Sequence, residues 1–347
     1  MLPEPFAGGF GAVQGWLFQT LVLPLLQAAG LAVYTEDAFN ATEDFLWGAL
    51  EIAVLAAVLL PLERRYPVER FARGSAVRTD VLYTLIHRLG LFPLFFFFTL
   101  RPLFDALQAT LHLRGVPTPN LESLIPALAA SPVASFLAYL VLLDLALYWI
   151  HRGQHAFGWW WALHSVHHSQ RQMTFWTDNR NHLLDSALTD SIFALIALLI
   201  GVPPAQFALL IVLPRMLESL AHANLRLSFG AIGERLLVSP RFHRLHHAIA
   251  ASPRGDYRGA NYAVLLPLWD LLFGTADFRP APGATGIDDQ LTGRDYGAGF
   301  WAQQWRGSSV SPGAAEHTAR RSRQGIAGRG AGPPPPMDGT DTRSCGT

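Results

Sequence analysis

Long apolar stretches separated by short polar ones dominate the chain. Residues 45–62, 79–104 and 132–150 are each apolar enough to cross a bilayer, which takes roughly 20 residues of helix. Pro93 predicts a kink in the second of these stretches. Residues 11–34 are also apolar but contain three glutamines and a proline. They predict either a first spanning helix or a helix that lies in the membrane interface.

A further apolar block lies between His182 and His222 and is divided by the sequence GVPP at residues 201–204. Glycine and proline interrupt helices, so the block predicts two helices of about 17 residues joined as a hairpin. Because a hairpin returns to the side on which it begins, its two ends should lie on one face of the membrane. Residues 105–131 contain several prolines and predict a loop.

Charged residues between the apolar stretches set the expected orientation. Residues 35–44 are acidic and are expected to form a loop, whereas residues 63–78 contain arginines and no lysine. Positively charged loops are retained in the cytoplasm, so residues 63–78 should be cytoplasmic. Counting crossings from there, residues 132–150 emerge on the cytoplasmic side at His151, and the hairpin begins and ends on that side. The sequence predicts an all-α, integral membrane helical bundle.

Composition supports this class of protein. Half of the 347 residues are apolar and 15% are charged, against roughly 25% charged residues in soluble domains. The net charge of zero provides no electrostatic basis for binding nucleic acid. The single cysteine, Cys345, excludes a disulfide framework and a thiolate metal site. Residues 305–347 have almost no large apolar side chains and predict a disordered tail.

Histidines give the sequence its candidate chemistry, since ten of the 13 fall between His151 and His247. They occur as HRGQH, HSVHH and HRLHH, with further single histidines in NH and HAN. Histidines at i, i+3 and i+4 share one face of a helix, and neutral imidazole suits iron, zinc, copper or nickel. Ten imidazoles exceed what one ion can use and fit two ions. The candidate ligands are His151, His155, His164, His167, His168, His182, His222, His243, His246 and His247.

Several polar residues beside these histidines could hydrogen-bond the ligating imidazoles, because metal-bound histidines usually donate their second N–H to a carboxylate or carbonyl. Asp144 and Tyr148 share a helical face with the first histidines, although Asp144 could instead pair with an arginine. Asp185 could serve likewise or could be a surface acid or helix cap. The remaining candidates of this kind are Asp178 and Asn224.

Other motifs give weaker evidence of function. Asp80 and His87 lie seven residues apart on one predicted helical face. They could hydrogen-bond the residues of the site, or they could be structural residues. No HExxH or GxSxG motif is present, so a zinc protease is unsupported, and Ser165 is not interpreted as a nucleophile.

The three histidine motifs, together with the preceding DLALYWIHR, resemble the histidine boxes of the fatty acid hydroxylase and sterol desaturase superfamily. The elements NHLLD, HANLR and NYAVLLPLWDLLFGT resemble further segments of that family. The resemblance covers residues 45–280. Leu183 and Asp185 depart from it, since the family often has proline and glutamate at these positions, which affects no ligand.

The resemblance implies an integral membrane, non-haem di-iron enzyme that uses O2 to hydroxylate or desaturate a lipid. The lipid could be a sterol, a fatty acyl chain, a carotenoid or an ether lipid. The histidines of the three boxes carry over as iron ligands, with His182 and His222 as further ones, and zinc could occupy the site in purified protein. Phe95 to Phe98 and Trp159 to Trp161 are candidate walls of a substrate cavity, or lipid-facing residues.

Electrons must then come from an external reductase, cytochrome or ferredoxin, because the chain has no GxGxxG fingerprint and no cysteine-ligated cluster. Two alternatives remain. A zinc-dependent hydrolase or isomerase would use the histidines to activate water. A metal transporter or sensor would place its ligands near the bilayer midplane.

The expected organisation has four parts. Residues 1–44 form an N-terminal apolar segment and acidic loop, and residues 45–280 form the membrane-embedded catalytic domain. Residues 281–304 form a connector, and residues 305–347 form the tail. The expected location is a bacterial inner membrane, with the histidine-rich metal-binding cap on its cytoplasmic face.

Overall fold

The computed structural model describes residues 4–70, 74–90, 101–116, 120–249, 259–279 and 284–307, where the regular secondary structure is helical. An antiparallel β-bridge joins Ala248 to Thr285, and these ranges contain no β-strand. The prediction of an all-α fold is confirmed for this part of the chain.

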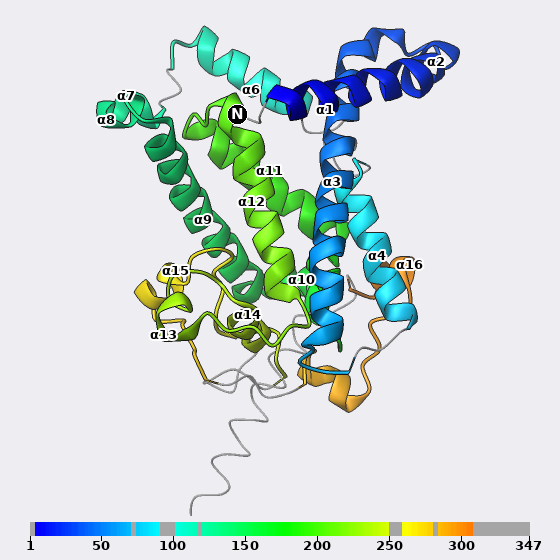
Figure 1. Cartoon of the computed structure of the whole chain (residues 1–347). Helices are drawn as coiled ribbons and strands as arrows, with labels where there is room; N and C mark the ends of the chain where they lie inside the picture. The colour runs from blue at the N-terminus through cyan, green and yellow to red at the C-terminus, as the bar shows by residue number, and fades with distance from the viewer. Residues whose placement is uncertain are drawn as a thin grey trace, which may run out of the picture.

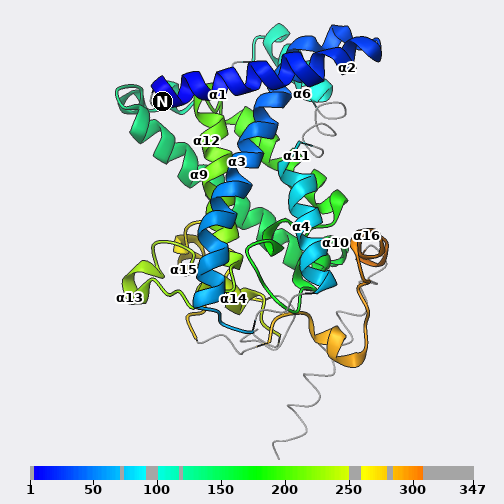
Figure 2. The ribbon, with the colours of Figure 1, turned by 45° about the vertical axis from the view of Figure 1, so that its right-hand side comes forward.

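Long helices run side by side to form the bundle: α3 (Thr35–Arg65), α4 (Ser75–Arg88), α9 (Pro132–Ala156), α11 (Leu183–Leu199) and α12 (Pro204–His222) (Figures 1 and 2). By length and composition, segments Ala32–Arg65 and Pro132–Ala156 can cross a membrane, as can Gly8–Ala28. The predicted spans at residues 45–62 and 132–150 are confirmed as helices of this kind.

The acidic residues 35–44 are not a loop, because they form the first turns of α3. Glu36 and Asp37 lie in the first turn of this 31-residue helix, where negative side chains interact favourably with the helix dipole. The expected boundary between residues 44 and 45 therefore falls inside a continuous helix. The sequence interpretation was wrong here because it read acidity as a break rather than as a helix start.

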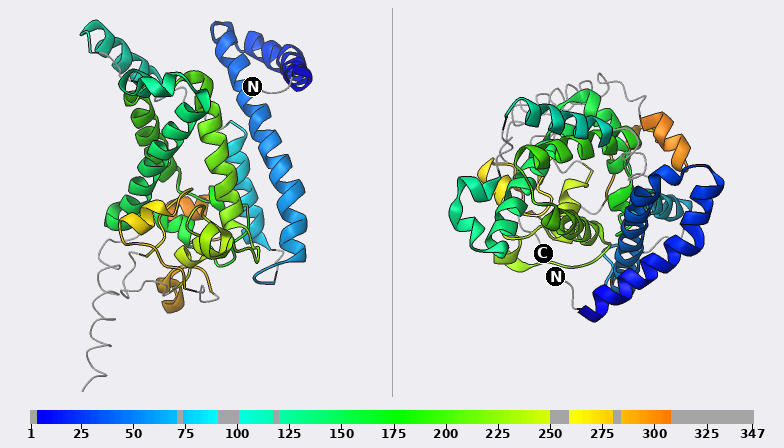
Figure 3. Two further views of the ribbon diagram at one scale, coloured as in Figure 1. Left: turned by 60° about the vertical axis from the view of Figure 1, so that its left-hand side comes forward. Right: turned by 90° about the horizontal axis from the view of Figure 1, so that it is seen from above.

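The N-terminal segment consists of α1 (Glu4–Leu17), a π-helical turn (Phe18–Val22) and α2 (Leu23–Ala28). It runs crosswise to the bundle at the end remote from α14, and seen from above it lies along one edge (Figures 1 and 3). The Phe18 ring packs edge-on against Phe39 of α3, with centroids 5.2 Å apart. This orientation matches the interfacial alternative, although length and composition would also allow a span.

The span predicted at residues 79–104 does not form one continuous helix. Helix α4 ends at Arg88, and Gly90 follows with a φ of +88°, a left-handed conformation that glycine adopts readily. Pro93 and Phe95 to Phe98 lie outside the described residues. Helix α6 (Arg101–Leu113) then begins within the expected span and continues into the expected loop.

Short helices replace much of the loop predicted at residues 105–131. After α6 come α7 (Leu121–Leu124) and α8 (Pro126–Ala129), two single turns before α9. Asn120 caps α7 by accepting a hydrogen bond from Ser123 N, and Pro126 occupies the first turn of α8. Prolines at helix starts therefore produced the loop signal, because proline is tolerated in the first turn of a helix.

The hairpin is confirmed: α11 and α12 are joined by a turn in which Gly201 has a φ of +66°. The Gly201 carbonyl accepts a hydrogen bond from the Tyr139 hydroxyl of α9 at 3.0 Å, which fixes the turn against the neighbouring helix. Both hairpin ends consequently lie at the same end of the bundle as the end of α9.

Short elements close that end of the bundle (Figure 1). They are α10 (Gly158–His168), η3 (Thr177–Asn179), α13 (Gly230–Gly233), α14 (Pro240–His246), α15 (Leu268–Leu272), η4 (Asp288–Thr292) and α16 (Phe300–Gly307). The expected connector is therefore partly helical, and the expected boundary after residue 304 falls inside α16. Residues 308–347, which carry most of the predicted tail, lie outside the described part of the chain.

Candidate metal centre

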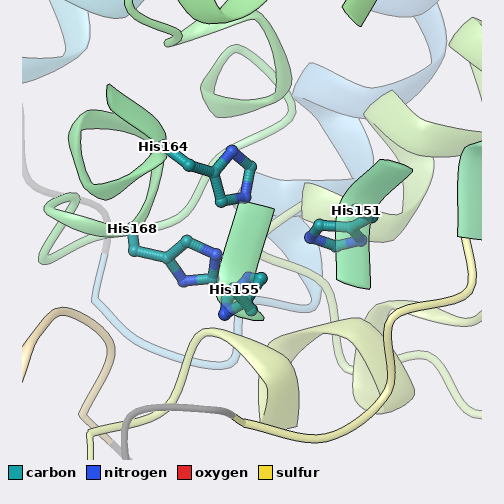
Figure 4. A group of neighbouring side chains, drawn as sticks. All are labelled: His151, His155, His164 and His168. Carbon is teal, nitrogen blue, oxygen red and sulfur yellow. The ribbon is translucent and has the colours of Figure 1, made fainter. Parts of the chain in front are cut away.

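Nine of the ten predicted ligands gather at the end of the bundle where α9, α10, α12 and α14 meet. Their nitrogens form three overlapping groups, and within each group the ligand atoms lie within 4.8 Å of one another. Figure 4 shows the first group, whose rings converge from α9 and α10. The first group is His151, His155, His164 and His168; the second is His167, His222, His243 and His247; the third is His168, His246 and His247.

The sharp turn between α9 and α10 creates the first group. Helix α9 ends at Ala156, Phe157 takes an extended conformation, and α10 begins at Gly158. The two helices approach closely because residue 153 is glycine: a Cβ there would lie 3.1 Å from Trp160 Cζ3. The histidines of α9 and those of α10 thus converge on one another across the turn.

Backbone carbonyls fix the tautomer of three imidazoles. His151 Nδ1 lies 2.8 Å from Tyr262 O, His222 Nδ1 lies 2.8 Å from Glu218 O, and His246 Nδ1 lies 2.7 Å from Ala260 O. A carbonyl oxygen can only accept, so Nδ1 carries the proton in each ring. The lone pair on Nε2 then points into the histidine cluster, which is the arrangement that metal binding needs.

Nε2 atoms crowd together, and the single lone pair on His222 Nε2 can accept from only one of its two close neighbours. His222 Nε2 lies 3.1 Å from His167 Nε2 and 3.0 Å from His243 Nε2. His246 Nε2 lies 3.2 Å from His168 Nε2. With lone pairs already fixed on His222 and His246, the converging nitrogens form electron-rich sites that a cation would stabilise.

Buried nitrogens without partners complete this fit. Both ring nitrogens of His155 and the Nε2 of His164 are buried and have no hydrogen-bond partner among the described residues. A buried polar atom left unsatisfied costs roughly 1–3 kcal/mol. Several such atoms aimed at common points are therefore expected only if something binds there, and the donor set of imidazoles fits a transition metal.

Burial keeps the imidazoles outside the spanning helices neutral. Desolvation, reinforced by neighbouring imidazoles, holds the pKa of His167, His168, His243 and His247 well below the usual value. Burial likewise lowers the pKa of His246 to about 3. At neutral pH these rings are in the unprotonated form that binds metal.

Asp185 lies against the first histidine group. Its buried carboxylate accepts hydrogen bonds from His164 Nδ1 at 2.9 Å, Trp160 Nε1 at 2.8 Å and Gln154 Nε2 at 2.8 Å. The contact directs the Nε2 lone pair of His164 toward the other rings. The structure thus places Asp185 where the sequence suggested, and as a partner of His164 rather than of the adjacent His182.

Three of the other four candidates for this role make contacts away from the histidines instead. Asp144 accepts hydrogen bonds from the backbone N–H groups of Leu265 and Leu266, at 3.0 Å each, and from Trp269 Nε1 at 2.8 Å. It therefore holds residues 261–275, which we call the closing segment, against α9. Among the described residues, Asp144 contacts no histidine and forms no ion pair with an arginine. The sequence placed Asp144 on the histidine face of the helix but could not show that the closing segment reaches it first.

Tyr148 and Asn224 need the same correction. The Tyr148 hydroxyl lies 2.9 Å from Thr275 Oγ1. Asn224 Oδ1 accepts from the N–H groups of Val68 and Glu69 at 3.1 Å each, which ties the arginine-rich loop to the end of α12. The Asn224 side chain is thus committed to the backbone of the loop, and the Tyr148 hydroxyl to the side chain of Thr275.

His182 stands outside all three histidine groups. Its Nε2 lies 2.8 Å from Gln304 O, and its Nδ1 accepts from Leu184 N at 3.2 Å as the cap of α11. With both nitrogens committed to backbone groups, His182 is removed from the ligand set. The sequence pattern could not separate this helix cap from a metal ligand.

Three further sequence candidates also lie apart from the cluster. Asp80 forms an ion pair with Arg180 at 3.2 Å, and His87 belongs to none of the histidine groups. Asp178 accepts from Arg88 at 2.8 Å. Ser165 donates to Ala162 O within its own helix, consistent with a structural residue.

The three tryptophans at residues 159–161 have different environments. The Trp161 ring lies 4.9 Å from His155 and 5.2 Å from His168 between centroids, so it covers the first group. Trp160 binds Asp185, and Trp159 is 55% exposed. Only Trp161 therefore borders the candidate site directly.

Sequence reasoning missed two buried acids that organise the site. Asp270 accepts from the N–H groups of Tyr262 and Ala263, at 2.9 and 2.8 Å, and so positions the carbonyl that binds His151. Glu63, fully buried, accepts from Asn224 N at 2.8 Å. An acid inside the apolar closing segment was a signal for Asp270, but Glu63 was read as part of the charged loop.

The fold and site define a membrane-embedded helical protein with a cluster of histidines able to bind metal at one end of its bundle. Residues 136–275 match the fatty acid hydroxylase family. The chain is 25% identical to an ornithine lipid hydroxylase of Rhizobium tropici over 295 residues, which covers 82% of each chain. No solved structure matches.

Alkylglycerol monooxygenases are also similar to part of the chain. The zebrafish (Danio rerio) protein is 34% identical over 133 residues, covering 38% of this chain and 28% of that protein. The human (Homo sapiens) protein is 31% identical over 146 residues, covering 42% and 31%. The chain thus spans less than a third of these two monooxygenases. Residues 136–275 are therefore similar to the fatty acid hydroxylase family, and the similar proteins are named as a hydroxylase and as monooxygenases.

Proposed function

We propose that this protein is a non-haem di-iron oxygenase that hydroxylates a C–H bond of a membrane lipid with O2 and external electrons. The observation that carries the proposal is the buried cluster of nine imidazoles whose lone pairs converge in overlapping groups. One ion would be held by His151, His155, His164, His168 and His246, and the other by His167, His222, His243 and His247.

Two bound iron ions would supply the redox chemistry that activates O2 toward an unactivated C–H bond. The residues of this chain prepare the site for them. Carbonyls at Tyr262, Glu218 and Ala260 hold the imidazoles in one tautomer, and Asp185 orients His164. Trp161 covers the rings on one side, which limits the access of water to the site.

Hydroxylation is proposed over desaturation because the relatives are named as a hydroxylase and as monooxygenases. Their names mention an ornithine lipid and an alkylglycerol, so a lipid with a polar headgroup is the proposed substrate class. Electrons would come from a separate reductase, cytochrome or ferredoxin.

The cytoplasmic face of a bacterial inner membrane is the proposed location of the metal site. The arginine-rich loop follows α3 at the end of the bundle that holds the histidines, where Glu63 accepts from Asn224 N at 2.8 Å. Arginine-rich loops favour the cytoplasmic side. The loop and the metal centre would therefore face the cytoplasm together.

The experiment is a metal and turnover analysis of the purified protein in lipid nanodiscs. We expect about two iron ions per chain, by the ligand count of the cluster, and O2 consumption that requires reductant and lipid. His167→Ala and His246→Ala should each abolish turnover and lower bound metal. His112→Ala, which removes an exposed histidine on α6, is the matched control.

Two outcomes would overturn the proposal. Full activity of metal-free protein would exclude an oxygenase of this kind. Turnover without O2 or reductant would instead support a zinc-dependent hydrolase or isomerase. Transport is disfavoured because α10 and α14, which carry candidate ligands, lie at one end of the bundle (Figure 1), whereas transporter sites lie near the midplane.

A further inference from the structure

Three charged side chains lie on the inner parts of the hairpin: Asp190 on α11, and Arg215 and Glu218 on α12. Charged residues inside a membrane bundle are rare, usually face its interior, and often mark the path of a substrate. All three residues keep an intermediate exposure, so their side chains are partly accessible rather than enclosed in packed core.

These three side chains make no hydrogen bond or ion pair with the residues that the structure describes. Arg215 interacts electrostatically with both Asp190 and Glu218, but at longer range. The neighbouring Arg88 shows the contrast, because its guanidinium binds Glu51 at 2.6 Å and Asp178 at 2.8 Å. The bundle thus satisfies one buried arginine and leaves a second one, with two carboxylates, available for a ligand.

The helices that carry these charges share one apolar cluster, which includes Ala197 of α11 and Leu210 of α12, and differ in their other neighbours. Helix α11 packs on α9 and α10, whereas α12 packs on α3, α9 and α14. Arg215 and Glu218 are three residues apart and so share one face of α12. Charged groups from both hairpin helices consequently lie near one another, since Arg215 interacts electrostatically with Asp190 and with Glu218.

This charged group lies close to the candidate metal centre. Glu218 is one helical turn before His222, about 6 Å along the axis at 1.5 Å per residue, and its carbonyl contacts His222 Nδ1 at 2.8 Å. Asp190 follows Asp185, which holds His164, by five residues, or about 7.5 Å. The charges therefore lie one to two turns from the ligands, on the bilayer side.

We propose that Arg215, Asp190 and Glu218 bind a zwitterionic headgroup of the lipid substrate, a proposal that rests on the proposed lipid oxidation. The Arg215 guanidinium would bind the anionic part, a carboxylate or phosphate, with two parallel hydrogen bonds. The two carboxylates would bind an ammonium group. Such a ligand satisfies all three charges at once, which neither a neutral nor a purely anionic headgroup can do.

The placement has a consequence for the product. A headgroup held one to two helical turns from the metal ligands brings nearby atoms of the same lipid to the site. We therefore expect the new oxygen within a few bonds of the headgroup rather than at the far end of an acyl chain. Fragmentation of the product in a mass spectrometer would locate it.

Headgroup selectivity can be measured without turnover, by native mass spectrometry of the full chain with added lipids and no reductant. Phosphatidylethanolamine is the zwitterionic probe, diacylglycerol the neutral one and phosphatidylglycerol the anionic one. A charge-assisted hydrogen bond contributes about 1.5–3 kcal/mol, so we expect a preference of about tenfold or more for phosphatidylethanolamine. Soluble phosphoethanolamine at the same concentration should not displace it.

The variants test recognition of the phosphate and of the ammonium group separately. Arg215→Gln should reduce binding of both phosphate-containing lipids relative to diacylglycerol. Asp190→Asn combined with Glu218→Gln should abolish the preference for phosphatidylethanolamine over phosphatidylglycerol. Arg235→Gln, at an exposed arginine, is the matched control, and Arg215→Lys should recover part of the phosphate preference.

Several results would overturn the assignment. Equal binding of the three lipids by the wild-type chain would do so even if a variant failed to fold. Unchanged selectivity in folded variants would exclude a lipid headgroup at these residues. Displacement by phosphoethanolamine at equal concentration would show instead that the ligand is a soluble zwitterion rather than a lipid. Absence of iron or of lipid oxidation would refute the proposed function. The binding data would still test headgroup selectivity independently of that result.

Discussion

Asp185→Asn tests the hydrogen bond that orients a proposed ligand. The Asp185 carboxylate receives three donors: one oxygen accepts from Gln154 and Trp160, and the other accepts from His164. An asparagine can keep the first oxygen as an acceptor, but its NH2 group then faces the N–H of His164. Two donors cannot share a hydrogen bond, so the imidazole must rotate or move its proton to Nε2, where it blocks metal binding.

The magnitude follows from the role of this contact. Removing an outer hydrogen-bond partner of a metal ligand typically lowers metal affinity by about 10–100-fold, or roughly 1.4–2.8 kcal/mol. The change lies in a buried network, with Asp185 1% exposed, so some loss of folding stability is also expected. An unsatisfied buried donor costs roughly 1–3 kcal/mol.

Asp144→Asn is the matched control, because Asp144 is 2% exposed and also accepts three N–H donors, none of them from an imidazole. Both variants should unfold at lower temperature. Only Asp185→Asn should lose metal more readily in a chelator competition followed by metal analysis. Equal metal affinity in Asp185→Asn and wild type, or an equal loss in Asp144→Asn, would refute the proposed orienting role.

The remaining predictions concern the ligand set and the bundle. His222→Ala should lower bound metal, whereas His182→Ala should retain it and reduce only stability; the opposite result in metal analysis would restore His182 as a ligand. Gly48→Ala should lower the unfolding temperature, since its Cβ would lie 1.7 Å from the Arg88 carbonyl oxygen and overpacking costs about 1–3 kcal/mol. Gly11→Ala, with open space around it, should be neutral or slightly stabilising in the same thermal assay. Arg88→Met leaves two buried carboxylates without their partner and should destabilise the protein by roughly 3–5 kcal/mol; an unchanged denaturation midpoint would show that this network is dispensable.

Much of the bundle was predictable because apolar length is a local property. The apolar stretches at residues 45–62 and 132–150 lie in α3 and α9, and GVPP marks the hairpin turn. The failures occurred at helix ends. An acidic stretch proved to be the start of α3, and proline-rich residues 105–131 proved to contain helix starts.

Partners of the side chains were the least predictable part of the site. Asp144 and Asp185 were both acids near histidines, yet only Asp185 contacts one. The difference depends on the closing segment, 121 residues beyond Asp144 in the chain, whose Leu265 N–H donates to its carboxylate. Helical spacing places a side chain on a face but does not say which distant segment arrives there.

The sequence by itself determined the class of protein and its chemistry: a helical membrane bundle with imidazoles on helical faces. Both follow from periodicity and composition, which need no knowledge of distant contacts. Only the tertiary structure decided which histidines share a group, since His167 and His222 meet across 55 residues with Nε2 atoms 3.1 Å apart. It also removed His182, whose two nitrogens bind backbone groups. An imidazole becomes a ligand only when its lone pair is free and aimed at others, and packing alone arranges that.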